Sequence, residues 1–411
     1  NFKYTKYTND YSSPAVLTQA QLDKDRDGAS TSETDYQADK DSYSLVYDYN
    51  MKDNLKFNLL SSYYNSVSES STSTSITNFD ESKIAFKPKL NYEYSKGTLT
   101  AGYDYTFNNI VRDTKLGNGA FYDISKMTNS VFLNNRYDMN KLELITGYRY
   151  EKSDYEMKDQ KYGTKTPSDM DKTSSNSAYS MGLNYLYSDS GKLYGKFESG
   201  YTFPDPRQYI NLTNGEGELN NLQDEEFMTY EIGFQDYIIN SLVKGAVYYT
   251  EKENEIRKKG SGLTVEFYNI DASKRIGGEL SISQNIKKLE LSESIAYVDA
   301  KVTEGTYEGK RIPYVSKITS SINATYTFNE KVDLSGNITY RDKYYVDASN
   351  LSGLVNDKFV TDIKVNYSID SNWKTYAGIN NLFNADYYNT INYSSEAYTY
   401  DPASERNYFI G

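Results

Sequence analysis

The chain has 411 residues, a formal net charge of −12, a mean hydropathy of −0.76 and 45 tyrosines, but no histidine or cysteine. The missing residue types exclude disulfides, thiolate metal sites and catalytic arrangements that depend on histidine. The acidic balance argues against a nucleic-acid partner, which would require a basic stripe. No run approaches the roughly 20 apolar residues of a transmembrane helix. A β-barrel remains compatible, because only alternate residues of its strands contact lipid.

Eight short turns divide the chain, and alternating segments flank each of them. The turns fall at 49–54, 95–97, 138–141, 188–191, 236–240, 287–288, 329–331 and 370–372. Long polar stretches lie between the turns, at about 9–40, 64–83, 109–127, 153–176, 202–225, 253–263, 302–313, 342–356 and 385–405. This rhythm predicts nine hairpins, and therefore roughly 18 antiparallel strands of about 9–12 residues, a few of them longer. Tight turns at one end and long loops at the other are typical of an outer-membrane barrel.

Aromatic residues recur two positions apart near the predicted strand ends, on the face that carries the aliphatic residues. These groups are Tyr103, Tyr105 and Phe107; Tyr148 and Tyr150; Tyr185 and Tyr187; and Tyr326 and Phe328. A tyrosine there can bury its ring among acyl chains and keep its hydroxyl among head groups. The pattern favours a membrane girdle over ordinary strand propensity, since the rings gather at strand ends.

The segment 265–286 contains no convincing turn, so we expect one long strand that projects beyond the membrane. Gly277 and Gly278 would then form a bend or a bulge inside it and not a connection.

The segment 359–369 shows most clearly that the strands have two different faces. Phe359, Ile363, Val365, Tyr367 and Ile369 share one face, which we expect to point outward. The other face carries Asp362, Lys364 and Asn366, which we expect to line a lumen.

Three groups of motifs, in the correct order, resemble the C-terminal barrel of TonB-dependent outer-membrane receptors. The first comprises 201–207 (YTFPDPR), 221–225 (NLQDE) and 230–233 (YEIG). The second comprises 268–279, with its Asn, Ala, Gly and Glu spacing, then 297–300 (YVDA) and 309–313 (GKRIP). The third comprises 378–388 (GINNLFNADYY) and 406–411 (RNYFIG). Asp224 departs from the pattern, because the family usually has proline there.

The resemblance implies an all-β, antiparallel transmembrane barrel in the outer membrane of a Gram-negative bacterium, with about 22 strands and a plug domain. Nothing in 1–411 resembles the plug. We therefore expect residues 1–411 to be a fragment of the barrel domain that lacks the plug and the first strands. In that case the barrel should show a gap, or a strained closure, between the strand at 1–8 and the strand at 406–411.

The function implied by the resemblance is energy-coupled uptake of a metal chelate, of the ferric siderophore or cobalamin type. Its partners would be the chelate, the TonB protein through the missing plug, and membrane lipid. The loop residues that we expect to contact the ligand are Tyr201, Arg207, Tyr209, Tyr344, Tyr345 and Tyr388. The alternative is a passive 18-stranded porin, and no catalytic constellation favours an enzyme.

One acidic segment suggests a cation site. Asp23, Asp25 and Asp27 precede Gly28 at alternate positions, as in the first half of a calcium loop. Thr34 stands at the twelfth position, where such a loop needs a bidentate glutamate, so a solvated acidic loop competes with a calcium site in an extracellular loop.

Overall fold

The computed structural model describes residues 1–13, 16–26, 28, 33–115, 119–161, 168–210, 219–259, 265–351, 353–394 and 397–411. The chain divides into two compact units. Asn1–Gly182, Glu198–Met228 and Lys252–Ile270 form unit 1, and Leu183–Phe197, Thr229–Glu251 and Asp271–Gly411 form unit 2.

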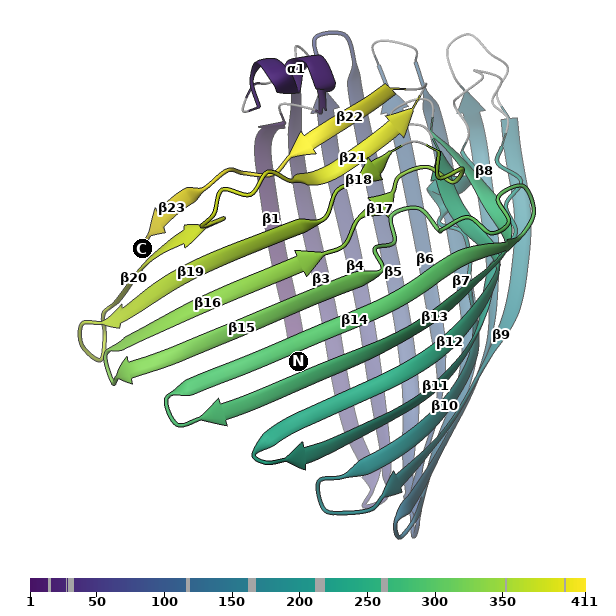
Figure 1. Ribbon diagram of the computed structural model, residues 1–411. Helices are drawn as coiled ribbons and strands as arrows, with labels where there is room; N and C mark the ends of the chain where they lie inside the picture. The colour runs from purple at the N-terminus through teal and green to yellow at the C-terminus, as the bar shows by residue number, and fades with distance from the viewer. Residues whose placement is uncertain are drawn as a thin grey trace. The chain divides into compact units, whose positions relative to one another are not determined.

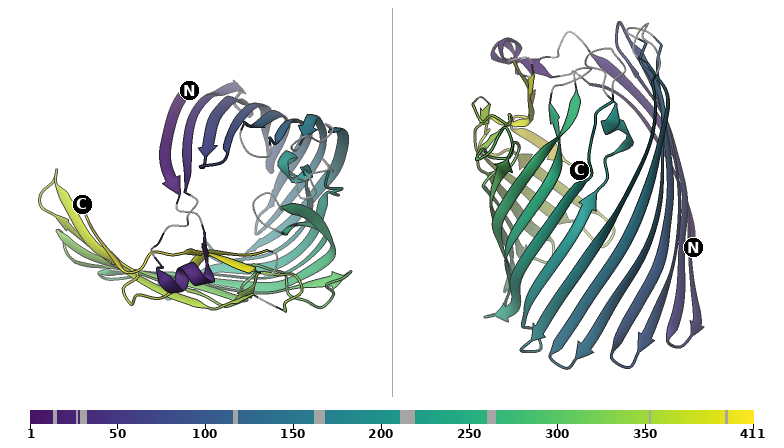
Figure 2. Two further views of the ribbon diagram at one scale, coloured as in Figure 1. Left: turned by 90° about the horizontal axis from the view of Figure 1, so that it is seen from above. Right: turned by 90° about the vertical axis from the view of Figure 1, so that its right-hand side faces the viewer.

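The part of the chain up to Ile286 forms long strands that lie side by side (Figure 1). In chain order its elements are β1 (Phe2–Ser13), β2 (Leu17–Thr18), α1 (Gln19–Lys24), β3 (Thr34–Lys52), β4 (Leu55–Ser71), β5 (Ile76–Tyr94), β6 (Gly97–Thr114), β7 (Phe121–Met139), β8 (Leu142–Lys161) and β9 (Ser168–Leu186). β10 (Lys192–Thr202), the short 3-10 helix η1 (Pro206–Tyr209), β11 (Glu225–Ile238), β12 (Ser241–Lys259) and β13 (Glu266–Ile286) follow. Seen along the strands, β1 and β3–β8 curve into an arc (Figure 2).

The part of the chain from Leu289 onward continues with shorter strands. Its elements are β14 (Leu289–Glu304), β15 (Ile318–Asn329), β16 (Val332–Arg341), β17 (Tyr344–Tyr345), β18 (Leu354–Val355), β19 (Lys358–Ser368), β20 (Lys374–Asn380), β21 (Tyr388–Ser394), β22 (Ala397–Pro402) and β23 (Asn407–Ile410). β14, β15, β16, β19, β20 and β23 pair in that order, all antiparallel.

Hydrogen bonding in the described part of the chain joins 18 strands into one antiparallel sheet, the predicted number. All eight predicted short turns are confirmed, since each connects two consecutive sheet strands. None of the described helices is long and apolar enough to cross a membrane. The described ladders pair β1 with β3 and β23 with β20. The expected gap between the two chain ends stays a prediction.

The strands are longer than predicted, and several predicted loops are wrong. β3, β5, β7 and β9 have 19 residues each, and only 72–75 separates β4 from β5 where a loop was expected at 64–83. Likewise, much of 109–127, 153–176 and 253–263 is strand, and 385–405 contains the β21–β22 hairpin. Polar residues on both faces suggest a loop in the sequence, but paired strands tolerate them wherever both faces meet water.

β13 is a single strand of 21 residues, as expected. The predicted bend at its glycine pair is wrong, because the register shift against β14 lies between Ala272 and Ser273. Gly277 serves a close approach instead. A Cβ there would meet the ring of Tyr248 and would lie 2.7 Å from the carbonyl oxygen of Tyr297.

Side chains alternate between an apolar and a polar face, and the strand register aligns each kind across neighbouring strands. In unit 1 one apolar row runs from Tyr63 through Ile84 and Phe107 to Met127. On β19 and directly after it, the predicted apolar residues Phe359, Val365, Tyr367 and Ile369 are all exposed, between 42% and 50%, and Ile363 is partly buried. The predicted exposure of this face is therefore confirmed for four of its five residues.

The buried clusters lie where connecting segments cover the polar face. In unit 1, Ile124 and Met157 are 0% exposed and pack with Tyr122 and Ile210. In unit 2, Tyr344, Val346, Val355 and Ile391 form a smaller core. The apolar face outside these clusters is exposed in both units, and such an extended exposed face requires an apolar environment.

Candidate functional site

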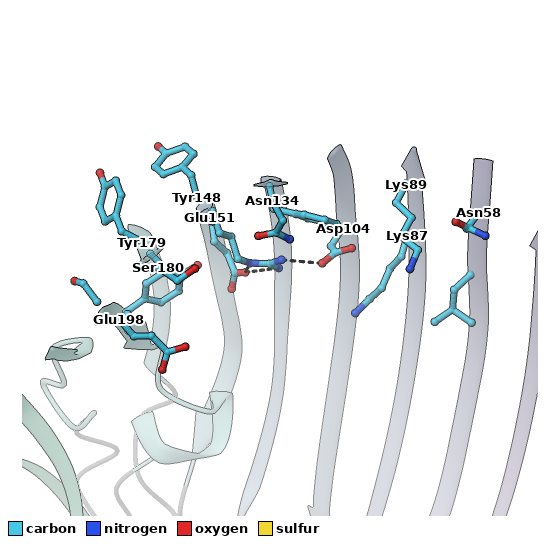
Figure 3. A pocket seen from close by; sticks show the side chains of 18 of the residues that line it. Asn58, Lys87, Lys89, Asp104, Asn134, Tyr148, Glu151, Tyr179, Ser180 and Glu198 are labelled. Carbon is cyan, nitrogen blue, oxygen red and sulfur yellow. Dashed lines mark hydrogen bonds and ion pairs between the residues drawn. The ribbon is translucent and has the colours of Figure 1, made fainter. Parts of the chain in front are cut away.

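The polar face of unit 1 contains a cavity of about 930 Å³ (Figure 3). Residues of β3–β11 line it, and their strand register places Asn58, Lys89, Gly102, Phe132 and Arg149 in one row. Because polar side chains recur at every second position, the cavity wall is rich in amide, ammonium and carboxylate groups. Such a wall can hold water or a polar ligand.

Arg149 on β8 connects the charged groups of this wall. Its Nη1 donates to Asp104 Oδ2 at 2.9 Å, and its Nη2 donates to Glu151 Oε2 at 2.8 Å. Nη2 also donates to Ser130 Oγ, so the guanidinium links β6, β7 and β8. Charge-assisted bonds of this kind hold side chains in fixed positions.

Two lysines of β5 contribute cations to the same cavity. Lys87 and Lys89 line it beside Asn58 of β4 (Figure 3). Among the described residues, neither lysine forms an ion pair within 4.0 Å. The wall therefore combines a compensated cluster around Arg149 with two cations that are open to an anionic group.

The segment after β10 packs against the polar face of unit 1 at the loop ends of β7 and β8. Tyr155 Oη donates to the carbonyl oxygen of Pro204 at 2.8 Å. Lys126 Nζ lies 3.5 Å from the same oxygen and above the rings of Tyr155 and Phe203, at 4.9 and 5.3 Å from their centroids. These contacts fix the start of the segment, because the cation and the two rings attract one another in a desolvated setting.

The same segment carries two groups whose burial has an electrostatic cost. Tyr209 is 1% exposed, its hydroxyl has no hydrogen-bond partner in the described part of the chain, and burial raises its pKa. Burial also raises the pKa of Asp224, although a hydrogen bond from Ser174 and the charge of Lys172 oppose the shift. Lys172 Nζ lies 4.9 Å from the Tyr209 ring centroid and donates to the carbonyl oxygen of Leu222.

The predicted ligand-contacting residues fall into two groups. Tyr201, Arg207 and Tyr209 belong to unit 1, where Tyr201 packs on Phe203 with ring centroids 4.8 Å apart and Arg207 pairs with Asp205 at 3.2 Å. The buried ring of Tyr209 can meet a ligand only if its segment moves. Arg207 remains exposed, and its role, like that of the other two, stays a prediction.

The other three predicted residues, Tyr344, Tyr345 and Tyr388, lie in unit 2, in or beside its small buried core. Tyr344 is 5% exposed in the small core, and Tyr388 packs against that core with its ring centroid 5.0 Å from that of Tyr400. Tyr345 forms β17 together with Tyr344. The structure therefore brings these three tyrosines together, while their contact with a ligand stays a prediction.

Sequence reasoning missed the cations beside these rings. The guanidinium carbon of Arg341 lies 4.7 Å from the Tyr344 ring centroid, and that of Arg311 lies 5.7 Å from the Tyr345 centroid. Lys358 Nζ lies 4.8 Å from the Tyr387 centroid. The available signal was their position, because Arg341 immediately precedes the predicted loop 342–356 and Lys358 follows its end by two residues.

The calcium interpretation stays a prediction. Asp23 lies in α1 and accepts a hydrogen bond from Gln19 at 2.7 Å, and Asp25 is the C-cap of that helix. Asp27 lies outside the described residues. Within the described ranges, no three acidic residues gather as a metal site would require.

The comparisons identify the family. The profile of the family "TonB dependent receptor-like, beta-barrel" matches residues 1–382, so the chain belongs to that family of receptors. The fold of this family is the antiparallel transmembrane β-barrel of the outer membrane of Gram-negative bacteria. The family consists of receptors and transporters, not enzymes.

Individual relatives are distant. The chain is 22% identical over 243 residues to the catecholate siderophore receptor Fiu of Escherichia coli, a match that covers 56% of this chain and 31% of the receptor. The crystal structure of that receptor in its closed form superposes with a TM-score of 0.78 at 13% identity and covers 100% of this chain and 71% of that chain. The crystal structure of the ferric yersiniabactin uptake receptor FyuA of Yersinia pestis superposes with a TM-score of 0.82 at 14% identity. This match covers 100% of this chain and 66% of that chain. In the sequence comparison, this chain spans about a third of the length of the curated relatives that it matches.

Proposed function

We propose that the chain is the barrel part of an outer-membrane receptor that imports a metal chelate, of the ferric siderophore type, with energy from TonB. The family match over residues 1–382 carries this proposal. The names of the relatives support the chelate class, because they are described as receptors for catecholate siderophores and ferric yersiniabactin.

The geometry is consistent with binding and passage and not with bond chemistry. The polar face of unit 1 offers a wide wall of polar side chains, while aromatic and cationic residues gather at the loop side of unit 2. Rings, amides and a few charges are the groups that orient a small ligand. We place the contact with TonB in a plug-type domain outside these 411 residues.

Uptake by cells tests the proposal. The full-length gene would be expressed in a Gram-negative host that lacks its own chelate receptors, and uptake of radiolabelled iron chelates would be measured with and without a functional TonB. We expect uptake that requires both the gene and TonB. Uptake that is independent of TonB and of the membrane potential would instead indicate a passive porin, which the comparisons do not favour.

A further inference from the structure

Two cations of unit 2 face each other across neighbouring strands. Arg341 is the last residue of β16, Lys358 is the first residue of β19, and the ladder between these strands makes the two residues direct partners. Like charges at directly opposite positions destabilise a strand pair. The placement therefore needs a compensating group.

The described carboxylates nearby do not supply this compensation. Asp342 and Asp357 adjoin the two cations in the chain, but among the described residues neither forms an ion pair with Arg341 or Lys358. Asp362 Oδ1 accepts a hydrogen bond from the backbone N–H of Asn381 at 2.8 Å. The charged group that acts on Lys358 is Arg341 itself. Neither cation forms an ion pair with another described residue.

Both cations are held in position by aromatic rings. Arg341 stacks over Tyr344, which is 5% exposed, and Lys358 lies over Tyr387. Among the described residues, no acceptor contacts the buried Nε of Arg341. A buried donor that lacks a hydrogen-bond acceptor costs free energy. The Nε–H of Arg341 is such a donor, and a second cation lies opposite it, so an anionic acceptor from a ligand would satisfy both groups.

Space for a ligand adjoins Lys358. A cavity of about 370 Å³ is lined by Lys358 and Tyr387 together with the amides of Asn337, Asn380 and Asn389. The carboxylate on its wall, Asp362, already accepts the hydrogen bond from Asn381. Asn337 and Asn380 each already donate one amide N–H, to Asn323 and Asn407. The donors that the wall offers to an oxygen-rich ligand are therefore the Lys358 ammonium and the remaining amide N–H groups.

We propose that Arg341 and Lys358 bind a negatively charged oxygen group of the chelate, so that the receptor selects anionic over neutral chelates. This inference rests on the proposed function and specifies the charge of its substrate. The planar guanidinium matches a pair of oxygens, as in a carboxylate or a catecholate, and the ammonium contributes a point charge.

Binding measurements on the full-length protein in outer-membrane vesicles test the inference. The probes are the tris(catecholato)iron(III) trianion and the neutral tris(acetohydroxamato)iron(III) complex, followed by equilibrium dialysis of radiolabelled iron. We expect the wild type to prefer the trianion. The double variant Arg341→Gln with Lys358→Gln should bind the trianion about tenfold more weakly and should bind the neutral complex unchanged.

Two further variants separate charge from structure. Arg341→Lys keeps the positive charge and should retain much of the preference for the trianion. Lys301→Gln removes a cation of the same unit that is already paired with Asp299 at 2.8 Å, and it should leave both affinities unchanged. Heat-dependent migration of the barrel on gels verifies that each variant is folded.

The outcomes distinguish the two proposals. Equal binding of both complexes by the wild type, or an unchanged preference in a folded double variant, would overturn the anion site and leave chelate uptake standing. Failure of the wild type to bind any chelate in a wider panel would overturn the proposed function itself.

Discussion

Tyr155 and Tyr209 meet edge to face, with ring centroids 5.2 Å apart and an angle of 72° between the ring planes. One ring comes from β8 and the other from η1, so the contact joins the segment after β10 to the sheet wall of unit 1. Leu222 completes the buried cluster. The position of this segment therefore depends on a few aromatic and backbone contacts.

Tyr155→Phe removes the hydroxyl that donates to Pro204 and keeps the ring contact. We expect the segment 203–210 to become less stable by about 1 kcal/mol, the usual contribution of one neutral hydrogen bond. Amide hydrogen exchange of this segment measures the change. Tyr179→Phe is the matched control, because Tyr179 is 52% exposed. Equal exchange in the wild type and in Tyr155→Phe would show that the hydrogen bond does not hold the segment.

Asp224→Asn tests the cost of burying a carboxylate. Because the pKa of Asp224 is raised above its ordinary value of 3.8, the folded state favours the protonated form. The resulting penalty is absent below 3.8 and complete above the raised native pKa. The variant should therefore protect 219–224 better than the wild type at pH 7 and equally well below pH 3.8, as hydrogen exchange can measure. A loss of protection at pH 7 would mean that the attraction of Lys172 outweighs the burial.

Arg149→Gln should destabilise unit 1, because it leaves Asp104 and Glu151 facing each other without the cation that both contact. About two thirds of the Arg149 side chain is shielded, so we expect a loss on the order of 1–2 kcal/mol in urea unfolding, less than for a fully buried pair. Adding Asp104→Asn should restore part of the loss. No change in the unfolding midpoint would show that water already screens the cluster.

Gly277→Ala should disturb the fold of β13, because the new Cβ would meet the Tyr248 ring. Overpacking of this kind costs about 1–3 kcal/mol. Tyr248→Ala should relieve only part of it, because the backbone carbonyl oxygen of Tyr297 would still lie 2.7 Å from the new Cβ. Gly195→Ala is the control, since nothing lies within 4 Å of its added Cβ. The yield of heat-modifiable barrel is the measurement, and a yield for Gly277→Ala equal to that of Gly195→Ala would contradict the close approach.

The sequence predicted the sheet well because alternation and turn chemistry are local. Each of the eight turns joins two strands whose outward residues, such as Phe359 and Tyr367, were recognisable from their period of two. The strand ends were not predictable in this way. Once both faces are polar, as around Val67 and Asp80, the pattern no longer separates a paired strand from a loop.

The candidate site was less predictable, because its contacts join residues that are far apart in the chain. In the sequence, Tyr209 stands in a polar stretch and looks like an exposed loop residue. Only the structure, through its contact with Tyr155, shows that it is buried. The pairing of Arg341 with Lys358 depends on the register across a connection of 16 residues, 342–357. No local periodicity encodes such a register.

The length of the strands has a consequence for the exterior of the cell. A strand of 19 residues rises about 65 Å, or about 50 Å along the membrane normal when it is tilted by about 40°. The apolar band is about 25 Å tall, so much of each long hairpin stands in water. These hairpins would be the first part of the protein that antibodies or phages encounter. Because the projecting part bears no lipid contact, its sequence can change under such attack while the membrane-facing rows remain intact.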